Sequence, residues 1–253
     1  MESKKPLKPA DRLIVAADFR PDPIMGQARA HVESQVLTLA KSLEGTDVYL
    51  KVNSALRACG YGLIDKIHNY GLRVFADLKL YDIGETLGTD GTLLREAKPE
   101  LLTVVCTTGF ASMQVLKAAL PDTEVLGVTV LTSLKEVDTR KMFACSVDEA
   151  VLRFAKEGHL AGIDGFISSA HEVKMLREYF GNAITLNTPA IRPLWAVVAG
   201  DDQNPDRIMT PAKAILAGAD RIVIGRPITQ AEDPFDAVMR TLEEIASVPM
   251  ACS

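Results

Sequence analysis

Several features that would indicate a particular class of protein are missing from these 253 residues. No run of 18 or more apolar residues occurs, so a membrane-spanning helix is not expected. The cysteines are far apart and form no C-x-x-C motif, and the histidines show no spacing typical of metal ligands. We therefore expect no metal site and no disulfide framework. Reduced thiols are the simplest interpretation, and they predict a cytoplasmic protein.

An excess of positive charge is also missing. Lys and Arg number 28 against 33 Asp and Glu, which gives a net charge of -5. No basic surface indicates binding to nucleic acid or to a membrane, so the positive charges for any anionic substrate must be local. Residues 1–11 contain lysines without an apolar stretch, which predicts a polar leader and not a signal peptide. No linker or low-complexity run divides residues 1–253, so we expect a single domain.

Short β-branched runs alternate with longer amphipathic stretches along the chain. The predicted strands are Arg12–Asp18, Val48–Val52, Arg73–Lys79, Leu101–Cys106, Glu124–Leu131, Gly165–Ser169, Ala183–Asn187 and Arg221–Gly225. The predicted helices are His31–Ser42, Ala55–Tyr70, Glu85–Ala97, Ala111–Ala119, Val147–Glu157, Glu172–Tyr179, Pro211–Leu216 and Pro234–Ile245. Near-continuous apolar strands are typical of a parallel sheet buried on both faces. Eight such units in about 250 residues predict a (β/α)8 TIM barrel. A doubly wound open sheet is the alternative.

Charged residues stand at or inside the apolar ends of the second and third predicted strands. Asp77 and Lys79 are two residues apart, so a regular strand places both side chains on one face. Lys51 ends the neighbouring strand, and Asp82 follows three residues after Lys79. Active sites of such barrels lie at the carboxyl ends of the strands, so we expect an array of alternating charge there. A buried ion-pair network that only stabilises the fold is the alternative.

An amine held between carboxylates suits one kind of chemistry in particular. The carboxylates keep the ammonium of Lys79 protonated and in place, so it can deliver a proton to a carbanion as the carbanion forms. The positive charge also stabilises the carbanionic transition state. A carboxylate in the same pocket disfavours a bound substrate carboxylate, which would favour decarboxylation. No metal or organic cofactor is needed if the pocket supplies this field.

At these residues the chain resembles the orotidine 5'-phosphate decarboxylase family. The segment DLKLYDIGET (77–86) matches the family's D-x-K-x-x-D-I pattern. Further matching segments follow in order: VTVLTS (128–133), NTPAIRP (187–193), Asp202-Gln203 with RIMTP (207–211), and IGRPIT (224–229). Together with Asp18 and KVN (51–53), the resemblance covers essentially the whole predicted barrel.

The resemblance implies the conversion of orotidine 5'-phosphate into UMP and CO2, with Lys79 as proton donor to C6 and Asp77 beside it. It implies a homodimer in which Asp82 and Thr86 enter the partner's site. The other substrate-binding residues that it implies are Asp18 and Lys51 at the ribose, Thr132 and Ser133 near the pyrimidine, Gln203, Gly225, Arg226 and Arg192 at the phosphate, and Ile83 and Pro189 within the matching segments.

The position of Gly225 and Arg226 supports a phosphate site independently, because barrels of this type often bind phosphate after strands seven and eight. A tight turn with a surface charge is the alternative. The loop 188–206 is long enough to close over a ligand as a lid.

Some residues depart from the family's usual pattern. Ala190 stands where glycine is frequent, the segment 194–201 is more apolar than expected for a lid, and residues 204–206 are inserted. These departures affect the predicted lid and Gln203 more than the charge array.

Two rival functions remain. A sister enzyme acting on sugar phosphates would use magnesium, for which Glu85 could be a ligand, and a silent phosphate-binding barrel would have no activity.

Overall fold

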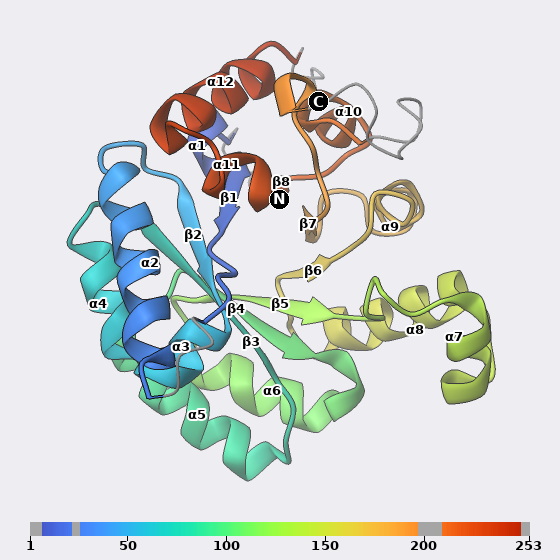
Figure 1. Cartoon of the computed structure of the whole chain (residues 1–253). Coiled ribbons are helices and arrows are strands. Elements are labelled where there is room, and N and C mark those ends of the chain that lie inside the picture. Colours follow the sequence, from blue (N-terminus) through green and yellow to red (C-terminus); the bar gives the residue numbers. More distant parts are fainter. Residues whose placement is uncertain (1–6, 22–25, 197–208, 249–253) are drawn as a thin grey trace.

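The strands form a closed parallel barrel, as the sequence predicts. The structure, a computed structural model, describes residues 7–21, 26–196 and 209–248. The strands pair in chain order, and β1 pairs with both β2 and β8 to close the ring (Figure 1). The strands are β1 Leu13–Ala16, β2 Tyr49–Val52, β3 Arg73–Leu80, β4 Leu101–Val105, β5 Glu124–Val128, β6 Gly165–Ile167, β7 Thr185–Thr188 and β8 Arg221–Ile224. An open doubly wound sheet is thereby excluded.

Helices surround the ring of strands (Figure 1). The α-helices are α1 Pro9–Arg12, α2 Ala28–Ser42, α3 Ser54–Cys59, α4 Gly62–His68, α5 Gly84–Ala97, α6 Phe110–Ala119, α7 Glu136–Phe143, α8 Val147–Leu160, α9 Val173–Phe180, α10 Pro211–Leu216, α11 Arg226–Thr229 and α12 Pro234–Ala246. Two short 3-10 turns are η1 Cys106–Thr108 and η2 Leu194–Ala196.

The core has two parts, which correspond to the two faces of the strands. One buried cluster fills the inside of the barrel and consists of Ile14, Ala16, Tyr49, Phe75, Leu101, Leu126 and Val223, with Ile167 packed against it. A larger cluster joins the outer strand faces to the helices. Side chains alternate between these two clusters along the regular parts of the strands, which indicates the positions that point into the barrel.

The amino-terminal end of the barrel is closed by ion pairs. Inside the barrel, Arg221 of β8 binds both carboxylate oxygens of Glu124 on β5, at 2.8 and 2.7 Å. The same guanidinium donates to Asn187 Oδ1 at 3.3 Å and lies 5.3 Å from the centre of the Tyr49 ring. These groups form a polar floor under the apolar layer.

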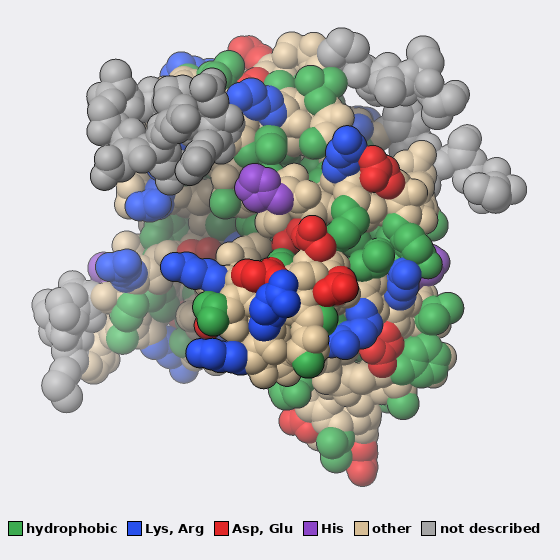
Figure 2. Space-filling model, turned by 90° about the vertical axis from the view of Figure 1, so that its right-hand side faces the viewer, with side chains coloured by type: hydrophobic (Ala, Val, Ile, Leu, Met, Phe, Trp, Pro, Cys, Tyr) green, Lys and Arg blue, Asp and Glu red, His purple; other side chains and the backbone are tan. Residues whose placement is uncertain are grey.

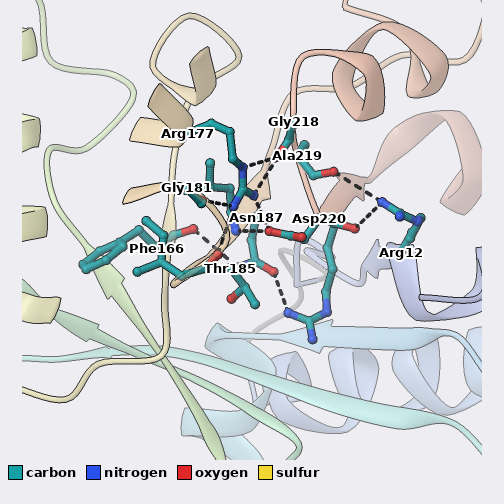
Figure 3. Close-up of polar contacts among 12 residues, drawn as sticks. Arg12, Phe166, Arg177, Gly181, Thr185, Asn187, Gly218, Ala219 and Asp220 are labelled. Carbon is teal, nitrogen blue, oxygen red and sulfur yellow. Dashed lines mark hydrogen bonds and ion pairs between the residues drawn. The ribbon is translucent and has the colours of Figure 1, made fainter. Parts of the chain in front are cut away.

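A second arginine ties the segments that lead into β7 and β8. Arg177 of α9 donates to the carbonyl oxygens of Gly181, Ile184 and Gly218, and it pairs with Asp220 at 2.6 Å. Figure 3 shows this guanidinium among the chain turns, with Arg12 reaching Ala219 and Asp220 from the other side. Because all of its acceptors precede the strands, this cluster holds the barrel at the end opposite to the expected active site.

Several details differ from the helices expected from sequence. The single helix predicted over 55–70 is two helices, because Gly60 takes a positive φ of 82° and ends α3. Helix α7 occupies part of the predicted long loop after β5. Residues 9–11 of the predicted polar leader belong to helix α1, which packs against β8 and α12.

Within the described residues, no helix combines the length and the apolar character needed to cross a membrane. The face shown in Figure 2 has acidic, basic and hydrophobic side chains next to one another, so no wide field of one charge covers it.

Candidate active site

Three neighbouring strands place a polar side chain inside the barrel, one layer above the apolar interior. The inner cluster contains Tyr49, Phe75 and Leu101. The positions two residues further along each strand are Lys51, Asp77 and Thr103, and all three side chains are buried. Since side chains two apart share a face, this polar layer points into the barrel toward the carboxyl ends of β2, β3 and β4.

Lys51 lies between two carboxylates. Its Nζ is 2.7 and 2.8 Å from the two carboxylate oxygens of Asp18 and 3.2 Å from Asp77 Oδ2. Asp18 follows Ala16 of β1 by two residues, and its side chain is 47% exposed, whereas those of Lys51 and Asp77 are 9% exposed. The amine of Lys51 therefore joins the buried layer to the open mouth of the barrel.

Asp77 in turn binds Lys79. The Lys79 Nζ lies 2.7 Å from Asp77 Oδ1, and the lysine side chain is 37% exposed. The four side chains Asp18, Lys51, Asp77 and Lys79 form one chain of alternating charge across β1, β2 and β3. An array of alternating charge is thus present. The pattern of charged residues in the sequence predicted Lys51, Asp77 and Lys79 as members, but it did not include Asp18.

The strand that carries the array is not regular. The pairing of β3 with β4 shifts between Ala76 and Leu80, and Lys79 has a positive φ of 48°. The alternation that predicted a shared face for Asp77 and Lys79 therefore does not apply beyond Asp77. Their contact depends on this bulge in β3, since a bulge redirects the side chain that follows it.

The surroundings of Asp77 favour its ionised form. Burial opposes ionisation, but attraction to Lys51 and Lys79 and hydrogen bonds from Lys79 and Thr103 outweigh it, so the pKa of Asp77 is lowered from its ordinary value. A carboxylate that stays ionised keeps both neighbouring amines in contact with a negative group.

The segment between β3 and α5 lies apart from this array within one chain. The carboxylate of Asp82 accepts the backbone N–H of Ile83 at 2.7 Å, and Thr108 Oγ1 donates to the carbonyl oxygen of Asp82 at 2.5 Å. Among the described residues, no contact joins Asp82 to Lys79. Tyr81 and Ile83 are 64% and 67% exposed, and Thr86 is half-buried in the first turn of α5.

The residues predicted to bind the rest of the substrate lie after β5, β7 and β8. Thr132 and Ser133 are exposed in the turn after β5, Pro189 directly follows β7, and Arg192 donates its backbone N–H to the carbonyl oxygen of Met209. Ala190, where the resemblance leads us to expect glycine, has a positive φ of 63°, a conformation that glycine adopts without strain.

Gly225 directly follows β8 and lies beside Ala16 of β1. A Cβ placed on Gly225 would be 3.7 Å from the Cβ of Ala16, which precedes Asp18 by two residues. Arg226 is the first residue of α11 and is exposed. Gln203 lies outside the described residues.

The chain matches a known protein family over most of its length. The model of the orotidine 5'-phosphate decarboxylase / HUMPS family matches residues 11–241. The chain belongs to this family. A protein of Afipia carboxidovorans with the name orotidine 5'-phosphate decarboxylase is 36% identical over 251 residues, 96% of this chain and 98% of its own length. The Gluconobacter oxydans protein of that name is 41% identical over 199 residues, 75% of this chain and 82% of its own length.

Solved structures also match. The crystal structure of orotidine 5'-phosphate decarboxylase from Lactobacillus acidophilus superposes with a TM-score of 0.77 at 30% identity, covering 94% of this chain and 100% of that one. An uncharacterized conserved protein from Geobacillus kaustophilus gives a TM-score of 0.74 at 27% identity, with 92% and 99% covered.

Two residues of the site were not predicted from sequence. Thr103 binds both Asp77 and the backbone of Lys79, and Arg57 of α3 donates to the carbonyl oxygen of Leu78 at 2.5 Å. Thr103 has one signal in the sequence, its position two residues after Leu101 on the inner face of β4. Arg57 has none, because a lysine or arginine on a short helix is ordinary. Within the described residues, no group of three or more His, Cys, Asp or Glu side chains could hold a metal ion.

Proposed function

We propose that this chain is an orotidine 5'-phosphate decarboxylase, which converts orotidine 5'-phosphate into UMP and CO2. The observation that carries the proposal is the chain of alternating charge from Asp18 through Lys51 and Asp77 to Lys79, at the mouth of the barrel. Membership of the family and the names of the relatives supply the substrate.

In this proposal the ammonium of Lys79 is the reacting group. The bond between C6 and the carboxylate carbon breaks, its electron pair stays on C6, and CO2 leaves as a neutral molecule. The Lys79 ammonium stabilises the negative charge that develops at C6 and then transfers a proton to it. Solvent returns the proton to the amine, and the 37% exposure of Lys79 leaves it accessible.

Asp77 and Lys51 keep this amine in position. Asp77 binds Lys79 with one carboxylate oxygen and Lys51 with the other. This double contact orients Lys79 without a rearrangement during the reaction, which is the property that makes an electrostatic site effective. Because Asp77 remains ionised at neutral pH, it also disfavours the substrate carboxylate next to it more than it disfavours CO2.

The remaining substrate contacts belong to the same proposal. Asp18 and Lys51 bind the ribose, Thr132, Ser133 and Pro189 lie near the pyrimidine, and the phosphate is held by Arg192, Gln203, Gly225 and Arg226. Contacts to the phosphate, which is remote from C6, lower the barrier only if their binding energy is used in the transition state. A substrate without the phosphate should therefore lose most of its kcat/KM.

The active form in this proposal is a homodimer. Among the described residues, Asp82 has no contact with Lys79 of its own chain, and its neighbours Tyr81 and Ile83 expose large apolar side chains. In a dimer Asp82, Ile83 and Thr86 enter the partner's site, which brings a further carboxylate to Lys79. The mass of the native protein in solution tests this part directly, and a monomer at the concentration of the assay contradicts it. A single-domain, cytoplasmic enzyme remains a prediction.

Replacing Lys79 tests the function. The Lys79→Ala variant should fold and bind UMP, but turn over orotidine 5'-phosphate several orders of magnitude more slowly, as expected when a transition-state interaction of roughly 5 kcal/mol is lost. Loss of substrate absorbance measures the rate. Lys174→Ala is the control, because Lys174 is an exposed lysine of α9, and its rate should not change. Near-normal turnover by Lys79→Ala would contradict the proposed role.

The same assay separates the sugar-phosphate alternative. An enzyme of that kind uses a magnesium ion, so a chelator such as EDTA should abolish its activity. For this chain we expect the rate with orotidine 5'-phosphate to be unchanged by EDTA.

A further inference from the structure

One hydroxyl group contacts both Asp77 and Lys79, which we call the catalytic pair. The side chain of Thr103 on β4 is fully buried. Its Oγ1 donates to Asp77 Oδ1 at 2.9 Å and accepts the backbone N–H of Lys79 at 2.8 Å. The same Asp77 oxygen accepts from the Lys79 amine. A closed loop of contacts thus runs from the backbone of Lys79 through Thr103 and Asp77 to the Lys79 side chain.

The backbone that Thr103 holds is an unfavourable one. Lys79 has a φ of 48°, in the left-handed region that costs a non-glycine residue roughly 1–2 kcal/mol. The bulge also removes Lys79 from the regular ladder between β3 and β4, so its N–H needs another acceptor, and Thr103 provides it. On the other side of the bulge, Arg57 donates to the carbonyl oxygen of Leu78. The two contacts together brace the bulge.

We propose that Thr103 is a positioning residue for this reaction, because its hydroxyl fixes both the backbone from which Lys79 extends and the carboxylate to which the Lys79 amine is bound. The proposal rests on the proposed function. In this proposal the direction in which the Lys79 amine points is set by a residue of the neighbouring strand β4, and not by Lys79 itself.

The use of this hydroxyl differs from that of other buried threonines. Thr241 of α12 is also fully buried, but its hydroxyl donates to the backbone carbonyl of Ala237 four residues earlier in the same helix. Thr123 likewise donates to a backbone carbonyl, that of Pro99. Those two contacts complete local structure only. The hydroxyl of Thr103 uses both its donor and its acceptor within the catalytic pair, so valine can replace its shape but not its two contacts.

The test compares Thr103→Val with Thr103→Ser, and Thr241→Val is the matched control. The concentration of intact sites is measured for each protein by titration with UMP, and kcat and KM for orotidine 5'-phosphate are then determined per site. For Thr103→Val we expect kcat to fall about 100-fold, the size of loss that misplacement by about 1 Å produces, with KM and UMP affinity changed only a few-fold. Thr103→Ser should recover most of the rate, and Thr241→Val should keep the rate of the unmodified enzyme.

The pH profile adds a readout that a structural defect would not move. The hydrogen bond from Thr103 helps to lower the pKa of Asp77. Without it, the acidic limb of kcat/KM should shift to higher pH in Thr103→Val and return in Thr103→Ser. If Thr103→Val does not fold, Thr103→Ala removes the hydroxyl and leaves space for a water molecule, and it is compared with Thr103→Ser in the same way.

Two results would overturn the inference. One is an unchanged kcat per site in Thr103→Val, and the other is a Thr103→Ser variant that is as slow as Thr103→Val. Failure of the proposed function is distinguishable, because the unmodified enzyme would then not consume orotidine 5'-phosphate. In that case crystal structures of the unmodified protein and Thr103→Val still decide the question. The 2.7 Å contact between Lys79 Nζ and Asp77 Oδ1 should be lost in the variant, and an unchanged contact would refute the role of Thr103.

Discussion

Removing the charge of Asp77 while keeping its shape measures how much its ion pairs contribute to the free energy of unfolding. In Asp77→Asn, Lys51 loses a partner at 3.2 Å in a layer where both side chains are 9% exposed. At an effective dielectric constant of about 20, the attraction at this distance is about 5 kcal/mol. The variant also avoids the cost of burying a carboxylate, and Lys51 keeps its contact with Asp18. We therefore expect a loss near the lower end of the roughly 3–5 kcal/mol typical of breaking a buried pair from one side.

Thermal and denaturant unfolding measure this loss. For a chain of this size, about 3 kcal/mol corresponds to a Tm lower by roughly 6–12 °C. The proteins are compared at one concentration, because the proposed dimer would make Tm depend on concentration. Glu178→Gln is the control, since Glu178 pairs with Lys174 at 3.8 Å and both side chains are mostly exposed. Its free energy of unfolding should stay within about 0.5 kcal/mol of that of the unmodified protein.

The pH dependence of the difference identifies its cause. The pKa of Asp77 is lower in the folded protein than its ordinary value of 3.8. Its ionised form therefore contributes stability that is fully present above about pH 4 and is lost as the pH falls through the lowered pKa. The difference between Asp77→Asn and the unmodified protein should be largest near neutral pH and should shrink below about pH 4. A variant as stable as the unmodified protein at pH 7, or a difference independent of pH, would refute this reasoning.

Two further predictions concern stability away from the site. His68 Nε2 is 3.2 Å from Glu100 Oε2; this hydrogen bond raises the pKa of His68 although burial opposes it. The contact stabilises the fold below about pH 6.5, and this stabilisation is lost as the pH rises through the raised pKa of His68. His68→Gln should therefore lower the free energy of unfolding by up to about 1 kcal/mol at pH 6 and by less at pH 8.5. Equal losses at both pH values would contradict this. A Cβ on Gly165 would lie 1.9 Å from Thr185 Oγ1, so Gly165→Ala should destabilise by about 1–3 kcal/mol or more. Gly62→Ala, in open space, is its control, and a similar Tm for both variants would show that β6 can move aside.

The strands were easier to predict from sequence than the helices. Most of the strands are near-continuous apolar runs, because a barrel strand is covered on both faces. Helix α7 has no such signal: Thr139 is its one buried residue, and the ion pair between Glu136 and Arg140 lies on its surface. Without an apolar stripe, its sequence is indistinguishable from that of a polar loop. The break at Gly60 could have been anticipated, since glycine commonly ends a helix.

The site was predictable where charge stands inside an apolar run, as at Lys51, Asp77 and Lys79. Thr103 was not, because threonine is common in strands and its role arises from the bulge in β3, a feature of tertiary structure. The bulge itself has no mark in the sequence, since lysine rarely takes a positive φ. In the proposed dimer Asp82 would reach Lys79 of the other chain, a contact that one chain alone cannot contain.

The left-handed backbone at Lys79 costs the folded protein roughly 1–2 kcal/mol, a cost that glycine at this position would avoid. Glycine would also remove the ammonium that pairs with Asp77 at 2.7 Å, so a buried carboxylate would lose one of its two partners. Backbone strain and ion pairing therefore act on stability in opposite directions at the same residue. Selection for heat resistance alone does not favour lysine through the backbone, whereas selection for turnover favours it through the ammonium.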